Sequence, residues 1–262
     1  RDSTVATSGV VTFTPAAGFS GVTPGVPYTV ADTGGVRSAA TTVTVTVTGV
    51  APVAVDDTGS TAQGAAVTVP LLANDEPGNA GTPLAPAATV WVAAAGQELS
   101  TDGKVLVVLD EAGNARFAPE PLLRGPATPV AYRLSDVDGG TATATLAITV
   151  DAVGPVAVDD ARSTQQNTPV EIPVLGNDGP GAAGGTPLDP ATVQLGAVDG
   201  VDPTDGGTSL ALPGVGTFVV GAAGVVTFTP VQGFVGATPA VPYTVADTGG
   251  VRSEPATITV TV

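Results

Sequence analysis

The chain has 262 residues, carries a net charge of −16 and contains neither cysteine nor histidine. Disulfides, Cys–His or Ser–His–Asp catalysis and most zinc sites are excluded, because each needs a missing residue type. Only eight Lys and Arg are present, which argues against nucleic acid or anionic lipid as a partner. We therefore expect no enzyme. Because no run of 18 apolar residues occurs, we also expect no membrane insertion in this fragment.

Alternation of Thr or Ala with apolar residues predicts strands that have one buried and one solvated face. In chain order the predicted strands are 27–30, 42–47, 53–55, 67–69, 105–109, 143–150, 225–228 and 257–262. Turns rich in Asp and Gly separate them about every ten residues. About seven short strands in roughly 100 residues is the pattern of an Ig-like sandwich. The fold class is therefore predicted as all-β, with tandem antiparallel Ig-like β-sandwich domains.

The sequence repeats itself at the length of a small domain. Pro-Val-Ala-Val-Asp-Asp at 52–57 returns at 155–160, and the segment 26–38 returns unchanged at 241–253. A period of this size indicates whole domains rather than solenoid units. We predict three domains in chain order: the second half of a truncated repeat at 1–48, a diverged complete repeat at 52–150 and a second complete repeat at 154–262.

The organisation of these domains suggests further expectations. The linkers are only three and four residues long (49–51 and 151–154), so we expect the domains to lie end to end as a rod. The half-repeat lacks the strands that should cover its apolar face, so we expect it to be less stable. Since the chain has no Met, we expect it to be part of a longer protein, with any signal peptide or anchor elsewhere.

The motifs of the repeat carry a family resemblance. After Pro-Val-Ala-Val-Asp-Asp, each complete repeat has Asn-Asp, at 74–75 and 177–178, and the last repeat continues with Val-Thr-Phe-Thr-Pro and Pro-Tyr-Thr-Val. This resembles the CshA-type fibril repeat of bacterial cell-surface adhesins and, more loosely, cadherin-like or Ig-like tandem adhesin repeats. The repeat at 52–150 departs from the pattern at 118–123, where Ala-Pro-Glu-Pro-Leu-Leu replaces the Thr-Pro-Val-Gln-Gly-Phe of 229–234.

The resemblance implies a function and a location. It implies structural stalk repeats of a surface fibril that project an adhesive tip from the cell wall of a bacterium. The expected partners are neighbouring repeats of the same chain and, through regions outside this fragment, a host surface or other cells. A carbohydrate-binding module is a weaker hypothesis, because the chain has only ten aromatic residues and most lie at repeated, core-like positions.

Calcium is the main alternative. The predicted strand order brings three acidic segments to one end of each complete repeat, and their candidate ligands are Asp56, Asp57, Asp75, Asp136, Asp138, Asp159, Asp160, Asp178 and Asp247. Calcium binds six to eight oxygens, so a calcium-rigidified cadherin-like adhesin that binds partners directly is possible. Asp and Asn also favour turns for purely structural reasons. The loops after Asn-Asp lack the Asp-x-Asp-Gly runs of calcium-binding relatives, and we therefore expect no metal and no cofactor.

Three other kinds of residue are candidates for a special role. Tyr28, Tyr132 and Tyr243 recur just before a turn, and we expect structural tyrosines whose rings lie in the core and whose hydroxyls bind backbone. Trp91 is expected in a core as well. Lys104 is the one lysine, and we expect it in a solvated turn rather than in an isopeptide crosslink.

Overall fold

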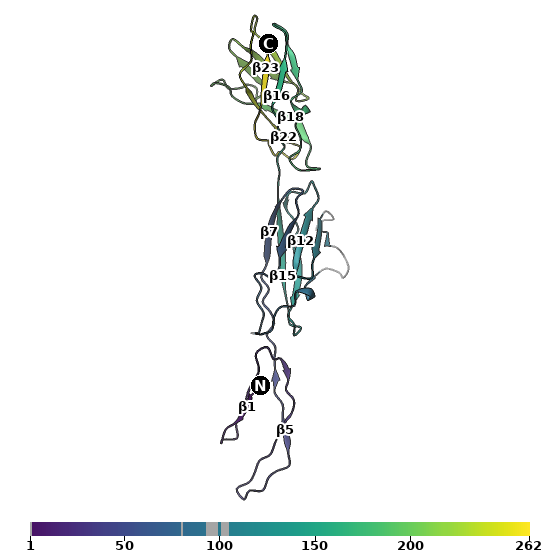
Figure 1. Ribbon diagram of the computed structural model, residues 1–262, viewed down its shortest axis with the longest axis vertical. Coiled ribbons are helices and arrows are strands. Elements are labelled where there is room, and N and C mark those ends of the chain that lie inside the picture. The colour runs from purple at the N-terminus through teal and green to yellow at the C-terminus, as the bar shows by residue number, and fades with distance from the viewer. Residues whose placement is uncertain (1, 80, 93–98, 101–104) are drawn as a thin grey trace. The chain divides into compact units, whose positions relative to one another are not determined.

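The computed structural model describes residues 2–79, 81–92, 99–100 and 105–262 (Figure 1). Regular structure in this part of the chain is almost entirely strand, with two single-turn 3₁₀ helices, η1 (Pro86–Ala88) and η3 (Val174–Gly176). The all-β prediction is confirmed. No helix in the described ranges is long and apolar enough to cross a bilayer. Lys104 lies outside the described residues, so its predicted place in a turn stays a prediction.

The chain divides into two compact units. The first unit contains residues 1–59, 67–117 and 127–148, and the second contains residues 60–66, 118–126 and 149–262. The last repeat, 154–262, therefore lies wholly in the second unit. The half-repeat, 1–48, lies wholly in the first.

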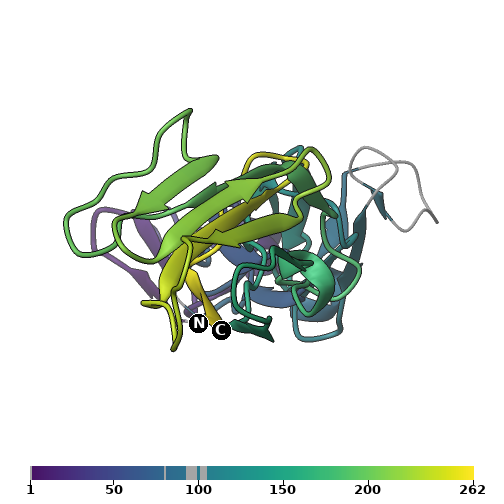
Figure 2. The same cartoon turned by 90° about the horizontal axis from the view of Figure 1, so that it is seen from above.

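The last repeat is a sandwich of two four-stranded sheets, drawn in green to yellow in Figures 1 and 2. The order in one sheet is β16–β23–β22–β18, and in the other it is β17–β21–β20–β19. The bounds are β16 (Asp160–Ser163), β17 (Val170–Ile172), β18 (Leu188–Leu195), β19 (Ser209–Leu212), β20 (Gly216–Val220), β21 (Val226–Pro230), β22 (Val241–Asp247) and β23 (Ala256–Thr261). The strands of this repeat pair antiparallel except β16 with β23, which pair parallel.

Alternating side chains from both sheets form the core of this repeat. β21, β22 and β23 each bury every second residue, as their sequence period of two predicts. Phe218 and Phe228 are fully buried, and their ring centroids lie 4.5 Å apart. Tyr243 is also fully buried. The core is therefore aliphatic with a few aromatic side chains at its centre.

The middle repeat has the same two-sheet construction. One sheet has the order β10–β11–β12–β8, and the other has the order β13–β15–β14–β9, with β7 also paired to β15. The bounds are β7 (Asp57–Ala62), β8 (Val67–Pro70), β9 (Val90–Trp91), β10 (Leu99–Ser100), β11 (Val105–Leu109), β12 (Asn114–Pro119), β13 (Gly125–Pro126), β14 (Val130–Ser135) and β15 (Thr141–Asp151). Trp91 packs edge-on against Tyr132 with ring centroids 6.4 Å apart.

The half-repeat forms three two-stranded ladders, β1–β2, β3–β6 and β4–β5. Their bounds are β1 (Asp2–Val5), β2 (Val11–Thr14), β3 (Gly21–Val22), β4 (Val26–Tyr28), β5 (Thr41–Val43) and β6 (Thr46–Val47). They correspond to β20–β23 of the last repeat. Tyr28 is 51% exposed, whereas Tyr243, in an identical sequence, is fully buried. The prediction that this tyrosine lies in a core is therefore wrong for the half-repeat, where the described strands include no counterparts of β16–β19.

Two predicted strands differ from the structure. Residues 53–55 do not form a strand, because Val53 makes a single bridge to Glu76 and the Val55 N–H binds the Asp75 side chain. The predicted strand 42–47 is interrupted between β5 and β6, where Thr23 binds both backbone groups of Val45. In both places a side chain from another segment accepts the backbone N–H in place of a sheet partner.

The matched pair Phe228 and Phe13 tests how far burial depends on the missing strands. Phe228→Ala should cost about 3–5 kcal/mol because it empties a filled core. Phe13→Ala should cost much less, since Phe13 is only half-buried. Hydrogen exchange of the β2 and β21 amides in the full chain measures both losses. Equal losses at the two positions would contradict the comparison.

Candidate functional site

The paired aspartates of Val-Asp-Asp take two different roles. Neighbouring residues of an extended chain point to opposite sides. Asp56 and Asp159 are exposed, and each accepts a backbone N–H from the last strand of its repeat: Thr145 at 2.8 Å and Thr257 at 2.7 Å. The following residues, Asp57 and Asp160, point inward and are each only 7% exposed. The first aspartate therefore ties the entry segment to the sheet, while the second enters the interior.

The Asn-Asp pairs hold the same entry segment from the other side. The Asn177 amide donates to the carbonyl oxygens of Val158 and Asp159 at 3.2 and 3.1 Å. Oδ1 of Asp178 accepts the Val158 N–H at 2.8 Å. Asn74 and Asp75 make the corresponding bonds in the middle repeat.

A buried tyrosine hydroxyl joins the two inner aspartates. The Tyr132 hydroxyl lies 2.8 Å from Oδ2 of Asp57 and 3.4 Å from Oδ2 of Asp75. It also lies 3.2 Å from the Leu71 carbonyl oxygen. This confirms the predicted structural tyrosine and adds a carboxylate pair. We call the set Tyr132, Asp57 and Asp75 the tyrosine–carboxylate cluster of the middle repeat.

The last repeat contains the same arrangement. The Tyr243 hydroxyl lies 3.0 and 3.1 Å from the two oxygens of Asp178, 3.0 Å from the Val158 carbonyl and 3.2 Å from the Val174 carbonyl. Asp160 completes this second tyrosine–carboxylate cluster. Within the described residues, Oδ2 of Asp160 is buried and has no hydrogen-bond partner.

Burial has the largest effect on the ionisation of both clusters. It raises the pKa of Asp57 and of Asp160; the hydroxyls of Tyr132 and Tyr243 lower these pKa values in part, and the nearby charges of Asp75 and Asp178 raise them. Burial also raises the pKa of Asp75 and of Asp178. In contrast, the backbone N–H of Thr145 lowers the pKa of the exposed Asp56. Neighbouring aspartates of one motif are therefore shifted in opposite directions.

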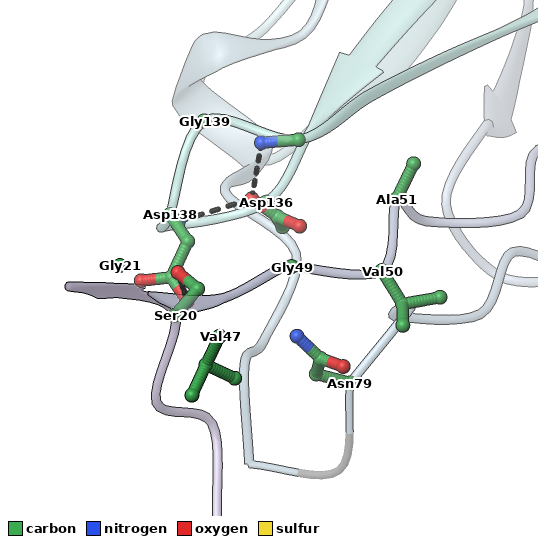
Figure 3. A pocket seen from close by; sticks show the side chains of 11 residues that line it. Ser20, Gly21, Val47, Gly49, Val50, Ala51, Asn79, Asp136, Asp138 and Gly139 are labelled. Atoms are coloured by element: carbon green, nitrogen blue, oxygen red, sulfur yellow. Dashed lines mark hydrogen bonds between the residues drawn. The ribbon is translucent and has the colours of Figure 1, made fainter. Parts of the chain in front are cut away.

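Asp136 organises a turn in the first unit. Its Oδ1 accepts the N–H groups of Asp138 at 3.0 Å and Gly140 at 2.7 Å (Figure 3). Gly139 has a φ of 87°, a left-handed conformation that favours glycine. Oδ2 of Asp138 accepts hydrogen bonds from the hydroxyls of Thr82 at 3.3 Å and Ser20 at 3.4 Å. Asp136 thus acts as a turn former.

Asp247 makes the equivalent turn in the second unit. Its Oδ1 accepts the N–H groups of Gly249 and Val251, and its Oδ2 forms an ion pair with Arg124 at 3.3 Å. The Arg124 guanidinium lies directly against Gly249, at the position where the middle repeat has Asp138. Sequence reasoning missed Arg124, because it lies far from Asp247 in the chain.

The nine candidate calcium ligands therefore separate into three structural groups. Two inward pairs surround tyrosines, two outward residues bind the last strand of their repeat, and Asp136, Asp138 and Asp247 belong to turns. Within the described ranges, no three acidic side chains are arranged to hold a metal ion. Alternation along the chain is the signal that could have separated the inward from the outward aspartates.

Two family models match successive parts of the chain. Residues 50–149 match the bacterial Ig domain. Residues 152–262 match the surface adhesin CshA repetitive domain. The resemblance seen in the motifs is confirmed, and the diverged middle repeat matches a different family. No curated protein matches the chain significantly.

The solved structures with a similar chain course include fragments of titin and of cadherins. The titin I-band fragment I67–I69 has a TM-score of 0.38 and 11% identity, over 88% of this chain and 72% of that one. Drosophila N-cadherin EC1–3 has a TM-score of 0.36 and 14% identity, over 99% and 85%. Protocadherin gamma C5 EC1–3 has a TM-score of 0.32 and 13% identity, over 91% and 77%. Likenesses this weak carry no argument about function.

Removing the Asp136 carboxylate tests its role in the turn. Asp136→Ala leaves two partly buried N–H groups without their acceptor and should cost about 1–3 kcal/mol. Asp136→Asn keeps one acceptor oxygen and should cost less. Asp138→Ala is the matched control, because its exposed carboxylate makes only longer bonds. Urea unfolding followed by fluorescence of Trp91, the sole Trp, measures all three. A loss for Asp138→Ala as large as for Asp136→Ala would contradict this assignment.

Proposed function

We propose that this chain is a segment of the stalk of a bacterial surface adhesin, and that it projects an adhesive tip from the cell wall to which a region outside the segment is anchored. The match of residues 152–262 to a surface adhesin repeat carries this proposal. A bacterial Ig domain directly precedes it, so the chain holds two β-sandwich modules in succession. Repetition of a module suits a protein whose task is reach.

The mechanism we infer is mechanical. Each complete repeat is held by its own core and its own tyrosine–carboxylate cluster, and short linkers leave neighbouring repeats little freedom to bend. Threonine-rich outer faces and the charge of −16 keep the edges of the sheets soluble and discourage pairing between chains. The partners in this function are neighbouring repeats, with contact to a host surface or other cells made elsewhere. The proposal includes no catalytic step.

We further propose that the repeats work without a bound metal. The oxygens that a calcium ion would need are engaged within the fold: Asp56 and Asp159 accept strand N–H groups, and Asp136 and Asp247 accept turn N–H groups. At the inward pairs, the Tyr132 hydroxyl binds oxygens of Asp57 and Asp75, and the Tyr243 hydroxyl binds both oxygens of Asp178. The calcium-rigidified adhesin that binds partners directly remains the competing proposal.

Small-angle X-ray scattering of the full chain tests the stalk. A compact globule of 262 residues would have a radius of gyration of about 18 Å. A stalk predicts a clearly larger radius that changes little with salt, because short linkers rather than charge repulsion keep it extended. A radius near the globular value would contradict the proposal.

Thermal unfolding with excess calcium or with chelator tests metal independence. We expect the same Tm in both, with magnesium as the control ion. A native-state site at a hundredfold excess over its Kd would instead add about 2.7 kcal/mol and raise the Tm by several degrees. A rise in Tm with calcium that disappears in the double variant Asp57→Asn, Asp160→Asn would favour the calcium-rigidified adhesin.

A further inference from the structure

We propose that each complete repeat holds one proton on one of the two carboxyl groups of its tyrosine–carboxylate cluster, which are Asp57 and Asp75 in the middle repeat and Asp160 and Asp178 in the last. The site belongs to the fold of the repeat. It holds whether the repeats act as a stalk or bind partners directly.

In the last repeat, hydrogen-bond donors are scarce around the tyrosine hydroxyl. A tyrosine hydroxyl has one proton to donate. The Tyr243 oxygen lies within 3.2 Å of four acceptor oxygens, which belong to Asp178, Val158 and Val174. Asn177 supplies one further donor to Val158, and the Val158 N–H supplies one to Asp178. More acceptors than protons therefore surround the hydroxyl.

Asp160 makes this shortage acute. Asp160 is only 7% exposed, and among the described residues its Oδ2 has no hydrogen-bond partner. A buried carboxylate oxygen without a donor is strongly disfavoured. A proton on either carboxyl group supplies the missing donor and removes one of two like charges. This is the behaviour of two carboxyl groups that share one site.

The middle repeat gives independent support. The Tyr132 hydroxyl again lies among an inward aspartate, the aspartate of Asn-Asp and a carbonyl oxygen of the chain. Asp57 is as buried as Asp160. The two repeats have diverged in sequence, yet both place two carboxyl groups around one phenol.

A proton fits this centre better than a metal ion does. In the middle repeat the Tyr132 phenolic oxygen lies 2.8 Å from an oxygen of Asp57 and 3.4 Å from an oxygen of Asp75, so it takes the position that a cation bound by both carboxylates would need. Within the described residues, no third acidic side chain joins either cluster to complete a metal site. The proton, in contrast, needs no added volume.

Few charged groups lie around the clusters. Asp160 faces Asp178 and Tyr243 from the neighbouring elements, with Asp159 and Arg162 beside it on its own segment. Asp57 faces Asp75 and Tyr132, with Asp56 beside it. Arg162 is the sole cation in this set, and its guanidinium binds the Ala161 carbonyl at an exposed position. Arg162 lowers the pKa of Asp160, whereas burial and the charge of Asp178 raise it, and the pKa is raised overall.

The consequence is a stability that falls as pH rises. The pKa values of these aspartates are raised by burial above the ordinary value of 3.8, so the native repeat holds a proton that the unfolded chain has lost. The stabilisation is complete below the ordinary value and disappears as the pH rises through the raised pKa. The repeats should therefore resist unfolding better in mildly acidic surroundings than at neutral pH.

Carboxyl ¹³C NMR titration of the full chain measures the proton directly. We expect at least one aspartate in each cluster to titrate above the ordinary value of 3.8, with Asp202, an exposed aspartate of the last repeat, as the reference. Titration of both aspartates of a cluster at or below that value would overturn the proposal. A midpoint that falls when calcium is added would also overturn it, because a metal would then compete for the site.

A pair of variants tests the effect on stability. Asp160→Asn supplies a permanent amide donor in place of the proton, so the last repeat should lose its fall in Tm between mildly acidic and neutral pH. Asp202→Asn removes the same charge from an exposed site and should keep that fall. Measurements at high salt screen the general repulsion of the acidic chain. Equal pH dependence in the two variants would overturn the proposal. If Asp160→Asn does not fold, the titration of the unaltered chain still decides.

Discussion

The buried tyrosine hydroxyl is the point on which the architecture of each complete repeat depends. Tyr243 comes from β22, near the end of the repeat, yet its hydroxyl contacts the carbonyl of Val158 in the entry segment and the carboxylate of Asp178 after η3. A single side chain thus connects three segments that are distant in sequence. Such contacts close long loops, and their energy must offset the entropy of closing them. Placing them at a fully buried position, where water cannot compete, gives each bond its greatest value.

The half-repeat shows how much of this depends on partners rather than on local sequence. Residues 26–38 and 241–253 are identical, but Tyr28 is half exposed and Tyr243 is fully buried. The segment forms a strand pair in both places, β4–β5 and β22–β23, so the local preference for extended structure is sufficient for the hairpin. Burial is not determined locally. It requires strands equivalent to β16–β19, and it gives the same tyrosine a core role in one context and a solvated position in the other.

Sequence reasoning predicted the strands better than the site, for a physical reason. Period-two alternation reports directly on burial, so β15 and β23 could be predicted nearly to their ends. The entry segment could not be predicted, because Val53 and Val55 are 55% and 45% exposed and bind a loop instead of a sheet. With that strand misassigned, the inward Asp57 was not separated from the outward Asp56, although alternation along the chain carries that signal. The ion pair of Arg124 with Asp247 depends on tertiary structure alone and has no local signal.

Acidic residues in this protein therefore serve two opposite purposes. Most of the Asp and Glu side chains in the described part of the chain are solvated and keep the surface charged, which favours solubility and opposes association. A small number are buried in the clusters, where a negative charge is costly and a hydrogen-bonded carboxyl group is not. A chain that needed only solubility could place every carboxylate outside. The presence of the same inward aspartate in two diverged repeats indicates that the cluster itself contributes to the fold, because it orders the entry segment against the core at the place where one domain begins.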